Sequence, residues 1–317
     1  MIKKRVLVVG FGIMGCRHVQ AFLDDKNKYE VHVLEPSESN IKENITKIDA
    51  EYDDCIWYSK LDSIPLLDIA IIATSSKPRF EIIKKLLKIG YRKFLLEKIV
   101  FQSENQFNII LKLFKEVHAV AYCNFVNRYF EAYKKIKKEL SNSENRTHIT
   151  IHGGEFGLGC NAIHYIDMFQ HLTNSNNLKF IKSKIEISKA KNRRGDDYKE
   201  FTGFFTLTNN KLDSIRIISE IKYNGGITIN IKNGDRNYFL NEQTKMFYYH
   251  TKKQFNFERF SIIPTSKLSN IIIDDIFNNT CILTKLDETY VAHVELFNVF
   301  NKTLYGKDFL KKLCPIT

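Results

Sequence analysis

Three glycines that follow a short apolar run constrain the fold of this chain more than any other stretch. The run KRVLVVG (4–10) is rich in valine and ends in glycine, which is typical of a buried parallel strand. It continues as VVGFGIMGCRH, where Gly10, Gly12 and Gly15 form G-x-G-x-x-G between the predicted strand and a helix over 16–25. The motif in this context predicts a turn that binds a dinucleotide.

Each glycine has a separate physical role in such a turn. Gly10 permits the tight bend, Gly12 lets the backbone approach a pyrophosphate, and Gly15 lets the helix pack closely on the strand. The helix N-terminus then offers backbone N–H groups and the positive end of its dipole to the phosphates. We therefore expect the cofactor to contact Gly10, Phe11, Gly12, Ile13, Met14 and Gly15.

Strands and helices alternate along the first part of the chain. Apolar runs predict strands over 29–36, 67–74, 93–98 and 119–125, and amphipathic runs predict helices over 79–90 and 103–117, with Gly90 as a C-cap. Regular β-α-β alternation favours a doubly wound parallel sheet, that is, a Rossmann fold. We assign residues 1–123 to this NAD-binding domain.

The pattern changes after a predicted helix over 129–140. Strand-like runs follow at 147–156, 182–190, 200–208, 211–222, 225–232, 236–242 and 245–251, separated by hairpin signals such as YNGG and KNGD. Helices are predicted over 158–167 and at about 266–280 and 287–304. We expect residues 124–317 to form an α+β substrate and oligomerisation domain, an open-faced antiparallel sheet with helices on one face. Its C-terminal helices are able to pack back on the first domain.

Polar residues at the ends of two strands extend the cofactor site. Glu35 ends the second strand, where a carboxylate accepts both hydroxyls of the adenosine ribose and repels a 2′-phosphate. We therefore expect NAD rather than NADP. Thr74, Ser75 and Ser76 follow the next apolar strand at its carboxyl end, and we expect them to line the nicotinamide half of the site.

Composition narrows the class of protein. Of 317 residues, 44% are hydrophobic and 26% charged, and no apolar run approaches the ~18 residues that span a bilayer, so we expect a cytoplasmic location. The six cysteines form no C-x-x-C pair, which favours reduced thiols and no metal site. The net charge of +12 comes from lysines spread along the whole chain. This spread disfavours nucleic-acid binding. Two explanations of the positive charge remain: a compositional bias toward lysine, or an electrostatic field that attracts a phosphorylated small molecule.

The stretch LGCNAIHYID (158–167) gathers chemically active side chains on one predicted helix face. Cys160, His164 and Asp167 lie on that face, with His171 one turn further on. A metal site, a nucleophile, an acid/base group and a solvated helix face are all conceivable. No second pair of ligands lies nearby, and no acyl chemistry is implied, so an acid/base or substrate-orienting histidine is favoured.

Together the stretches GFGIMGCRH, IIATSSKPRF and LLEKIV resemble the glucose-fructose oxidoreductase, inositol dehydrogenase and rhizopine catabolism (Gfo/Idh/MocA) family. The resemblance implies a nucleotide-binding domain paired with an open-faced antiparallel sheet along essentially the whole chain. It implies that Glu97 lies near the nicotinamide ribose, that Lys98 is the catalytic lysine and that His164 is the active-site histidine. Asp167 is the trailing aspartate of that motif, and we expect it to orient His164.

The same resemblance implies substrate contacts. Asn124 and Arg128 of NFVNRY are expected in the substrate cleft, where the guanidinium holds a phosphate or carboxylate, although an interdomain salt bridge is as plausible. Asn161 is expected to bind a substrate hydroxyl. Tyr165 is a further candidate for substrate contact, with core packing as the alternative.

Three positions depart from the family pattern. Ile99 replaces the proline of E-K-P, so a cis peptide after Lys98 would be a costly non-proline one, and its presence is left open. The ATP-type turn reads Ala73-Thr74-Ser75. Cys160 stands where relatives carry an aspartate, which removes a carboxylate that often binds or deprotonates substrate.

These features predict an NAD-dependent oxidoreductase that moves a hydride between nicotinamide and a sugar hydroxyl or keto carbon. The basic composition and Arg128 favour a nucleotide-linked or anionic sugar, such as a building block of surface glycans or glycoproteins. Two alternatives stay open: a non-catalytic sensor of dinucleotide or sugar, and a glycosidase that uses NAD without net redox change. An open sheet often pairs with its copy, so we expect a homodimer or homotetramer.

Overall fold

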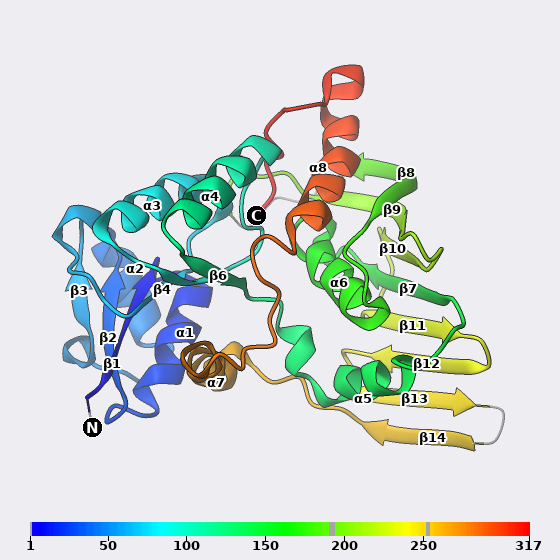
Figure 1. Cartoon of the computed structure of the whole chain (residues 1–317), viewed down its shortest axis with the longest axis horizontal. Helices are drawn as coiled ribbons and strands as arrows, with labels where there is room; N and C mark the ends of the chain where they lie inside the picture. Colours follow the sequence, from blue (N-terminus) through cyan, green and yellow to red (C-terminus); the bar gives the residue numbers. More distant parts are fainter. Residues whose placement is uncertain (1, 190–193, 252–253) are drawn as a thin grey trace. The chain divides into compact units, whose positions relative to one another are not determined.

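The computed structural model describes residues 2–189, 194–251 and 254–317. The chain forms two compact units. The first comprises the residues up to Phe101, Gln106–Asn124 and Ile263–Asp287. The second comprises Gln102–Asn105, Phe125–Ile262 and Glu288–Thr317. Figure 1 shows the elements of both units along the chain. Within the described ranges, no helix is both long and apolar enough to cross a membrane.

The first unit contains a six-stranded sheet in the order β3-β2-β1-β4-β5-β6, and every pair in it is parallel. Its strands are β1 (Lys4–Val9), β2 (Tyr29–Leu34), β3 (Ile56–Tyr58), β4 (Ile69–Ile72), β5 (Lys93–Leu96) and β6 (Val120–Cys123). Its helices are α1 (Ile13–Leu23), α2 (Glu38–Ile45), α3 (Ser76–Ile89), α4 (Glu104–Glu116) and α7 (Thr265–Asn278). The predicted doubly wound sheet is confirmed.

Burial explains why these strands were recognisable from the sequence. All four residues of β4 are fully buried, as are the four last residues of β1, because helices cover parallel sheets on both faces. Gly90 ends α3 at φ +116°, the left-handed C-cap expected of it. Two elements were not predicted: α2, which buries only Ile41 and Asn44, and β3, which has three residues.

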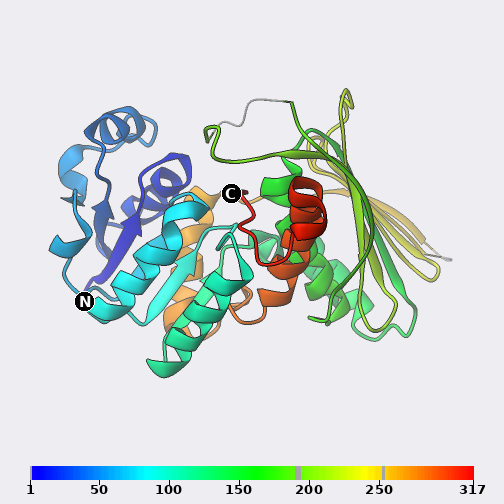
Figure 2. The ribbon, with the colours of Figure 1, turned by 90° about the horizontal axis from the view of Figure 1, so that it is seen from above.

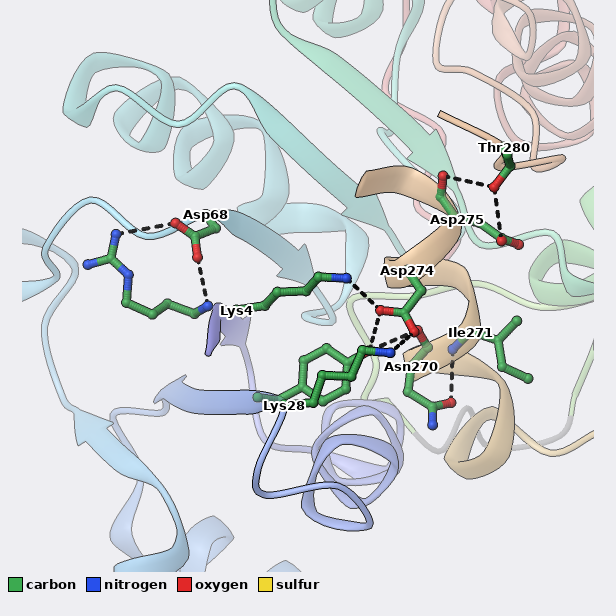
Figure 3. A network of polar contacts seen from close by, with 10 residues as sticks. Lys4, Lys28, Asp68, Asn270, Ile271, Asp274, Asp275 and Thr280 are labelled. Atoms are coloured by element: carbon green, nitrogen blue, oxygen red, sulfur yellow. Dashed lines mark hydrogen bonds and ion pairs between the residues drawn. The ribbon is translucent and has the colours of Figure 1, made fainter. Parts of the chain in front are cut away.

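Helix α7 belongs to the first unit, although it lies far along the chain, and it packs on α1. Figure 3 shows the polar network on this helix, in which Lys4 and Lys28 reach Asp274. The Nζ of Lys4 lies 2.7 Å from Oδ1 of Asp274, and the hydroxyl of Tyr29 donates to the same oxygen at 2.7 Å. This network ties α7 to β1 and β2.

The second unit contains an eight-stranded sheet in the order β14-β13-β12-β11-β7-β10-β9-β8. Its strands are β7 (Thr147–Gly154), β8 (Lys179–Ile187), β9 (Phe201–Thr208), β10 (Ser214–Glu220), β11 (Thr228–Asn233), β12 (Arg236–Asn241), β13 (Met246–Thr251) and β14 (Gln254–Arg259). Its helices are α5 (Glu131–Leu140), α6 (Leu158–Thr173) and α8 (Tyr290–Tyr305). Figures 1 and 2 show these three helices on one face of the sheet.

The sheet departs from the prediction in two respects. It is mostly antiparallel, but β7 and β10 pair in parallel. The chain runs from β7 through α6, β8 and β9 before it enters β10, so this pair is joined by a long crossover and not by a hairpin. Strand β14 was not predicted. The predicted strand 182–190 corresponds to β8, but its last residue, Ala190, lies outside the described residues.

The face of this sheet away from the helices carries exposed aromatic side chains. In the register of β12, β13 and β14, Phe239 is opposite Tyr248, and Tyr248 is opposite Phe257. The rings of Tyr248 and Phe257 lie 4.9 Å apart, and Phe257 is half exposed. Phe255 is exposed on the neighbouring position of β14. The open face predicted from the sequence is therefore apolar along this edge.

Asp274 offers a test of how α7 is held. Burial raises the pKa of its carboxyl, but hydrogen bonds from Lys28, Lys4 and Tyr29 outweigh this and lower the pKa below its usual value. The charged form is thus favoured by folding, and its contribution is complete above the pKa of an unfolded aspartate, about 3.9. It is lost as the pH falls through the lowered pKa of the folded state.

We predict that Asp274→Asn lowers the free energy of unfolding at pH 7 by about 1 kcal/mol. The difference from the wild type should disappear in acid, below the pKa of the folded Asp274. Urea denaturation at several pH values measures this. Glu81→Gln, at the exposed ion pair with Lys84, is the control and should change stability by no more than a few tenths of a kcal/mol. A pH-independent loss in Asp274→Asn would contradict the assignment.

Candidate functional site

The turn after β1 has the geometry that a pyrophosphate needs. Gly10 adopts φ +91°, and a Cβ on Gly15 would lie 1.8 Å from the carbonyl oxygen of Gly10. Both positions therefore require glycine. A Cβ on Gly12 would meet nothing within 4 Å, so the space above this residue is open. The first hydrogen bond of α1 runs from Cys16 N–H to Gly12 C=O, which leaves the N–H groups of the first turn directed at that space.

The residues within this turn divide into two groups. The side chain of Ile13 is 70% exposed and borders the open space, whereas Phe11 is fully buried against Trp57 with ring centroids 5.0 Å apart. The N–H of Phe11 donates to Glu35. Phe11 was predicted to contact the cofactor. Its side chain packs in the core, and its backbone N–H is bonded to the carboxylate of Glu35.

Glu35 lies at the end of β2, beside the turn. Its Oε2 accepts the N–H of Phe11 at 2.8 Å, and its Oε1 accepts the N–H of Ser37 at 3.0 Å. Oε1 also accepts Nδ2 of Asn40 at 3.5 Å. A carboxylate oxygen has two lone pairs, so Oε2 retains acceptor capacity for a ribose hydroxyl. The predicted acidic residue is thus oriented by the same turn that it would serve.

A buried arginine connects the loops that follow β4 and β5. The guanidinium of Arg79, on α3, donates to the carbonyl oxygens of Thr74, Glu97 and Ile99. Arg79 is 2% exposed, so these are charge-assisted hydrogen bonds in a low-dielectric interior. The hydroxyl Oγ1 of Thr74 is buried and has no hydrogen-bond partner among the described residues. Arg79 was not among the residues predicted for the site.

Glu97 is a buried carboxylate held by two side chains. Its Oε1 lies 3.0 Å from Nε2 of His18 and 2.7 Å from Nδ2 of Asn124. Burial raises its pKa, but hydrogen bonds from His18 and Asn124, with the charges of His18 and Lys98, hold the pKa of Glu97 to about 2. Glu97 is therefore ionised at neutral pH.

His18 was missed by the sequence analysis and links Glu97 to α7. Because a carboxylate can only accept, the proton between His18 and Glu97 is on Nε2. Its Nδ1 lies 2.8 Å from the hydroxyl of Ser269, which donates to the carbonyl of Thr265. The position of His18, one turn beyond Gly15 on the buried face of α1, was the available signal.

The two residues predicted beside Glu97 have different surroundings. Lys98 is 9% exposed and follows Glu97 at the carboxyl end of β5. The peptide bond between Lys98 and Ile99 is cis, which the sequence had left open. Asn124, predicted in the substrate cleft, donates to Glu97 and is 3% exposed, so it is placed to position Glu97.

In the second unit, the start of α6 is fixed by neighbouring groups. Gly157 precedes the helix at φ +81°, and the carboxylate of Glu200 accepts the N–H of Gly159. The Nδ2 of Asn161 donates to the carbonyl of Phe156 at 2.5 Å. The ring of His164 packs edge-on against Phe125, with centroids 5.8 Å apart. These contacts set the orientation of the helix face that carries His164.

Three predicted residues of α6 line one pocket of about 260 Å³ in the second unit. They are Asn161, His164 and Tyr165, and they face Glu242, which follows β12. The other lining residues are Val126, Asn127, Phe130, Ile227 and Ile262. Cys160 is not among them; it accepts a hydrogen bond from Arg194 at 3.2 Å.

Arg128 and Asp167 form a bidentate ion pair. Nε and Nη2 of Arg128 lie 3.0 and 2.9 Å from the two carboxylate oxygens of Asp167, which is fully buried. Both residues belong to the second unit. The guanidinium of Arg128 thus holds a protein carboxylate, as in the salt-bridge alternative left open for it, but the pair lies within one unit. A buried aspartate needs such a cation beside it.

Glu242 was missed because an isolated glutamate at the end of a strand resembles any solvated turn residue. Its carboxylate accepts the hydroxyl of Tyr165 at 3.1 and 3.2 Å. Burial raises the pKa of Glu242 to about 7, although the hydrogen bond from Tyr165 opposes the shift. A group with this pKa exchanges its proton near neutrality. In the described ranges, no group of three or more His, Cys, Asp or Glu side chains is arranged to hold a metal ion.

A glycine-rich turn after the first strand, an acidic residue at the end of the second and a doubly wound parallel sheet define the class of Rossmann folds that bind dinucleotides. Residues 4–125 match the model described as "Oxidoreductase family, NAD-binding Rossmann fold". The model is that of the Gfo/Idh/MocA oxidoreductases, so the match to this part of the chain agrees with the family resemblance of its motifs. No curated protein sequence matches the chain.

Solved structures are similar to the chain over nearly its whole length. UDP-N-acetylglucosamine 3-dehydrogenase GnnA from Acidithiobacillus ferrooxidans has a TM-score of 0.73 and 14% identity, covering 94% of this chain and 97% of that one. The dehydrogenase MviM from Clostridium difficile has a TM-score of 0.75 and 15% identity, and the likeness covers 95% of this chain and 100% of that one. A super-repressor mutant of Gal80p from Saccharomyces cerevisiae has a TM-score of 0.71 and 14% identity, and the likeness covers 96% of this chain and 97% of that one. At these identities the likeness shows the fold.

The glycines of the turn give a matched pair of variants. In Gly15→Ala the new Cβ meets the backbone carbonyl of Gly10, so we predict a loss of about 3 kcal/mol in the free energy of unfolding. In Gly12→Ala the new methyl group points into open space. We predict stability within about 0.5 kcal/mol of the wild type but about tenfold weaker NADH binding. Denaturation and fluorescence titration measure the two effects, and unchanged NADH affinity in Gly12→Ala would count against the turn as a phosphate site.

Proposed function

We propose that the protein is an NAD-dependent oxidoreductase that acts on a hydroxyl or keto carbon of a sugar, carried on a nucleotide. The observation that carries the proposal is the turn at Gly12, open above its Cα and flanked by Glu35 and the buried Thr74 hydroxyl. The nucleotide-sugar dehydrogenase among the structural relatives supports the substrate class. A nucleotide-linked sugar of this kind is a building block for surface glycans or glycoproteins.

Bound NAD supplies the hydride acceptor, and the protein manages the proton of the sugar hydroxyl. Lys98 is proposed to stabilise the negative charge that develops on the sugar oxygen. Glu97, ionised and held by His18 and Asn124, fixes the backbone from which Lys98 projects. His164 is proposed to hydrogen-bond the same hydroxyl and to pass its proton to solvent.

Lys98 and His164 variants test the reaction. With NAD and UDP-N-acetylglucosamine, followed by absorbance of NADH, we expect Lys98→Ala to lower kcat at least about 100-fold and His164→Asn at least about tenfold. Neither variant should change the Kd for NADH more than twofold. Lys179→Ala, on a strand of the second unit, is the matched control and should be unaffected.

Other outcomes identify the alternatives. NADH that binds without hydride exchange for any sugar in a panel would favour the sensor, for which the likeness to Gal80p is the supporting observation. Release of a leaving group without NADH accumulation would indicate the glycosidase.

Preference for NAD over NADP is part of the proposal and rests on Glu35. Its carboxylate repels a 2′-phosphate and accepts ribose hydroxyls. Glu35→Gln keeps an oxygen for the N–H of Phe11 but loses the charge, so we predict that the preference for NADH over NADPH falls about tenfold. Fluorescence titration of both nucleotides measures this ratio. A wild type that binds NADPH at least as tightly as NADH would contradict the choice of NAD.

A further inference from the structure

The pocket of the second unit has an unusual charge balance for a protein with a net charge of +12. Its nine lining residues include one carboxylate, Glu242, one histidine, His164, and one tyrosine, Tyr165. No lysine or arginine is among the lining residues in the described part of the chain. A pocket of this composition favours ligands that donate hydrogen bonds and carry no negative charge.

The nearby arginine does not reverse this balance. Arg128 lies on the same short 3₁₀ segment as Val126 and Asn127 of the pocket wall. Its guanidinium forms the bidentate pair with Asp167, whose carboxylate is fully buried. The charge of Arg128 is therefore balanced within the protein. The guanidinium that was expected to bind a sugar carboxylate or phosphate is bonded to Asp167 instead.

The carboxylate of Glu242 is held in a defined orientation. The backbone N–H of Glu242 donates to the carbonyl of Ile227 at 2.9 Å, and Tyr165 donates its hydroxyl to the side chain. The lone pairs beyond those used by Tyr165 are available to a ligand in the pocket. Asn161 and His164, one turn apart on α6, supply further polar groups on the facing wall.

We propose that Glu242 is the residue that determines which sugar ring this pocket accepts. Its carboxylate accepts hydrogen bonds from the hydroxyl groups of a neutral ring and excludes a ring that bears a carboxylate or phosphate. This inference rests on the proposed function, since it names the part of the substrate that the site recognises.

The ionisation of Glu242 makes the inference testable by pH. Burial brings its pKa to about 7, and the titratable groups around it are His164 and Tyr165 on α6 and Tyr133 on α5. Both tyrosines have pKa values raised well above 10 by burial, so they stay neutral in this range. An ionised carboxylate is the stronger acceptor, so the neutral ring should bind more tightly as the pH rises through about 7.

The experiment is calorimetric binding at pH 6 and 8.5, with NADH present. The probes are UDP-N-acetylglucosamine and its analogue oxidised to a carboxylate at C6 of the sugar. We expect the wild type to prefer the neutral sugar at least about tenfold at pH 8.5 and to bind it less tightly at pH 6. Glu242→Gln should lose about tenfold in affinity for the neutral sugar at pH 8.5, lose the pH dependence, and discriminate less against the carboxylate.

Tyr165→Phe separates titration from simple damage to the pocket. The hydrogen bond from Tyr165 lowers the pKa of Glu242, so its removal should shift the midpoint of the pH dependence upward without abolishing it. Glu258→Gln, at the ion pair with Lys135 on β14, removes a carboxylate outside the pocket and should match the wild type.

The outcomes distinguish this inference from the proposed function. A wild type that binds both sugars equally, or neither, overturns the role of Glu242, and so does a Glu242→Gln variant with an unchanged pH dependence. Binding of the neutral sugar with the expected preference, but without hydride transfer, leaves the role of Glu242 in place and overturns the proposed oxidoreductase activity.

Discussion

The buried carboxylate of Glu97 is the interaction on which the first unit depends. An unpaired buried carboxylate would be strongly unfavourable, so its partners must be supplied by the fold. His18 reaches it from α1 and Asn124 from the end of β6, and His18 is itself held by Ser269 of α7. One charge therefore fixes four elements around the residue that precedes Lys98.

Arg79 performs the complementary function on the backbone. Its guanidinium donates to carbonyls in the loops after β4 and β5, and so joins the Thr74 turn to the Glu97–Ile99 segment. A cation and an anion, both almost fully buried, thus lie on either side of the same short segment. This arrangement preorganises the backbone at Lys98 without requiring either charged group to contact the substrate.

In the second unit, two buried carboxylates differ in the partners that the fold supplies to them. Asp167 is satisfied by Arg128, whereas Glu242 has one hydroxyl partner and remains at the pocket wall. The carboxylate of Asp167 is paired with a guanidinium, whereas burial raises the pKa of Glu242 to about 7. The carboxylate with the fewer partners is the one suited to bind a ligand.

Short sequence patterns were enough to predict the buried strands and the glycine turn of the first unit. Val6–Val9 and Ile69–Ile72 predicted buried parallel strands, and Gly10, Gly12 and Gly15 predicted the turn, because backbone sterics and burial act over a few residues. Short elements such as α2 and β3 were not predicted, since they bury too few residues to leave a pattern. The family resemblance pointed to His164 and helical spacing pointed to Asn161 one turn before it; in the structure both line one pocket.

Only the tertiary structure decided how the polar groups pair. Arg128 and Asp167 are 39 residues apart, His18 and Glu97 are 79 apart, and Tyr165 and Glu242 are 77 apart. No local pattern encodes such partners, yet they determine which charges are neutralised and which remain available to a ligand. The sequence by itself determined the sheet, the turn and the cofactor class, because these depend on neighbouring residues. The charge of the pocket in the second unit depends on long-range pairing, and only the tertiary structure established it.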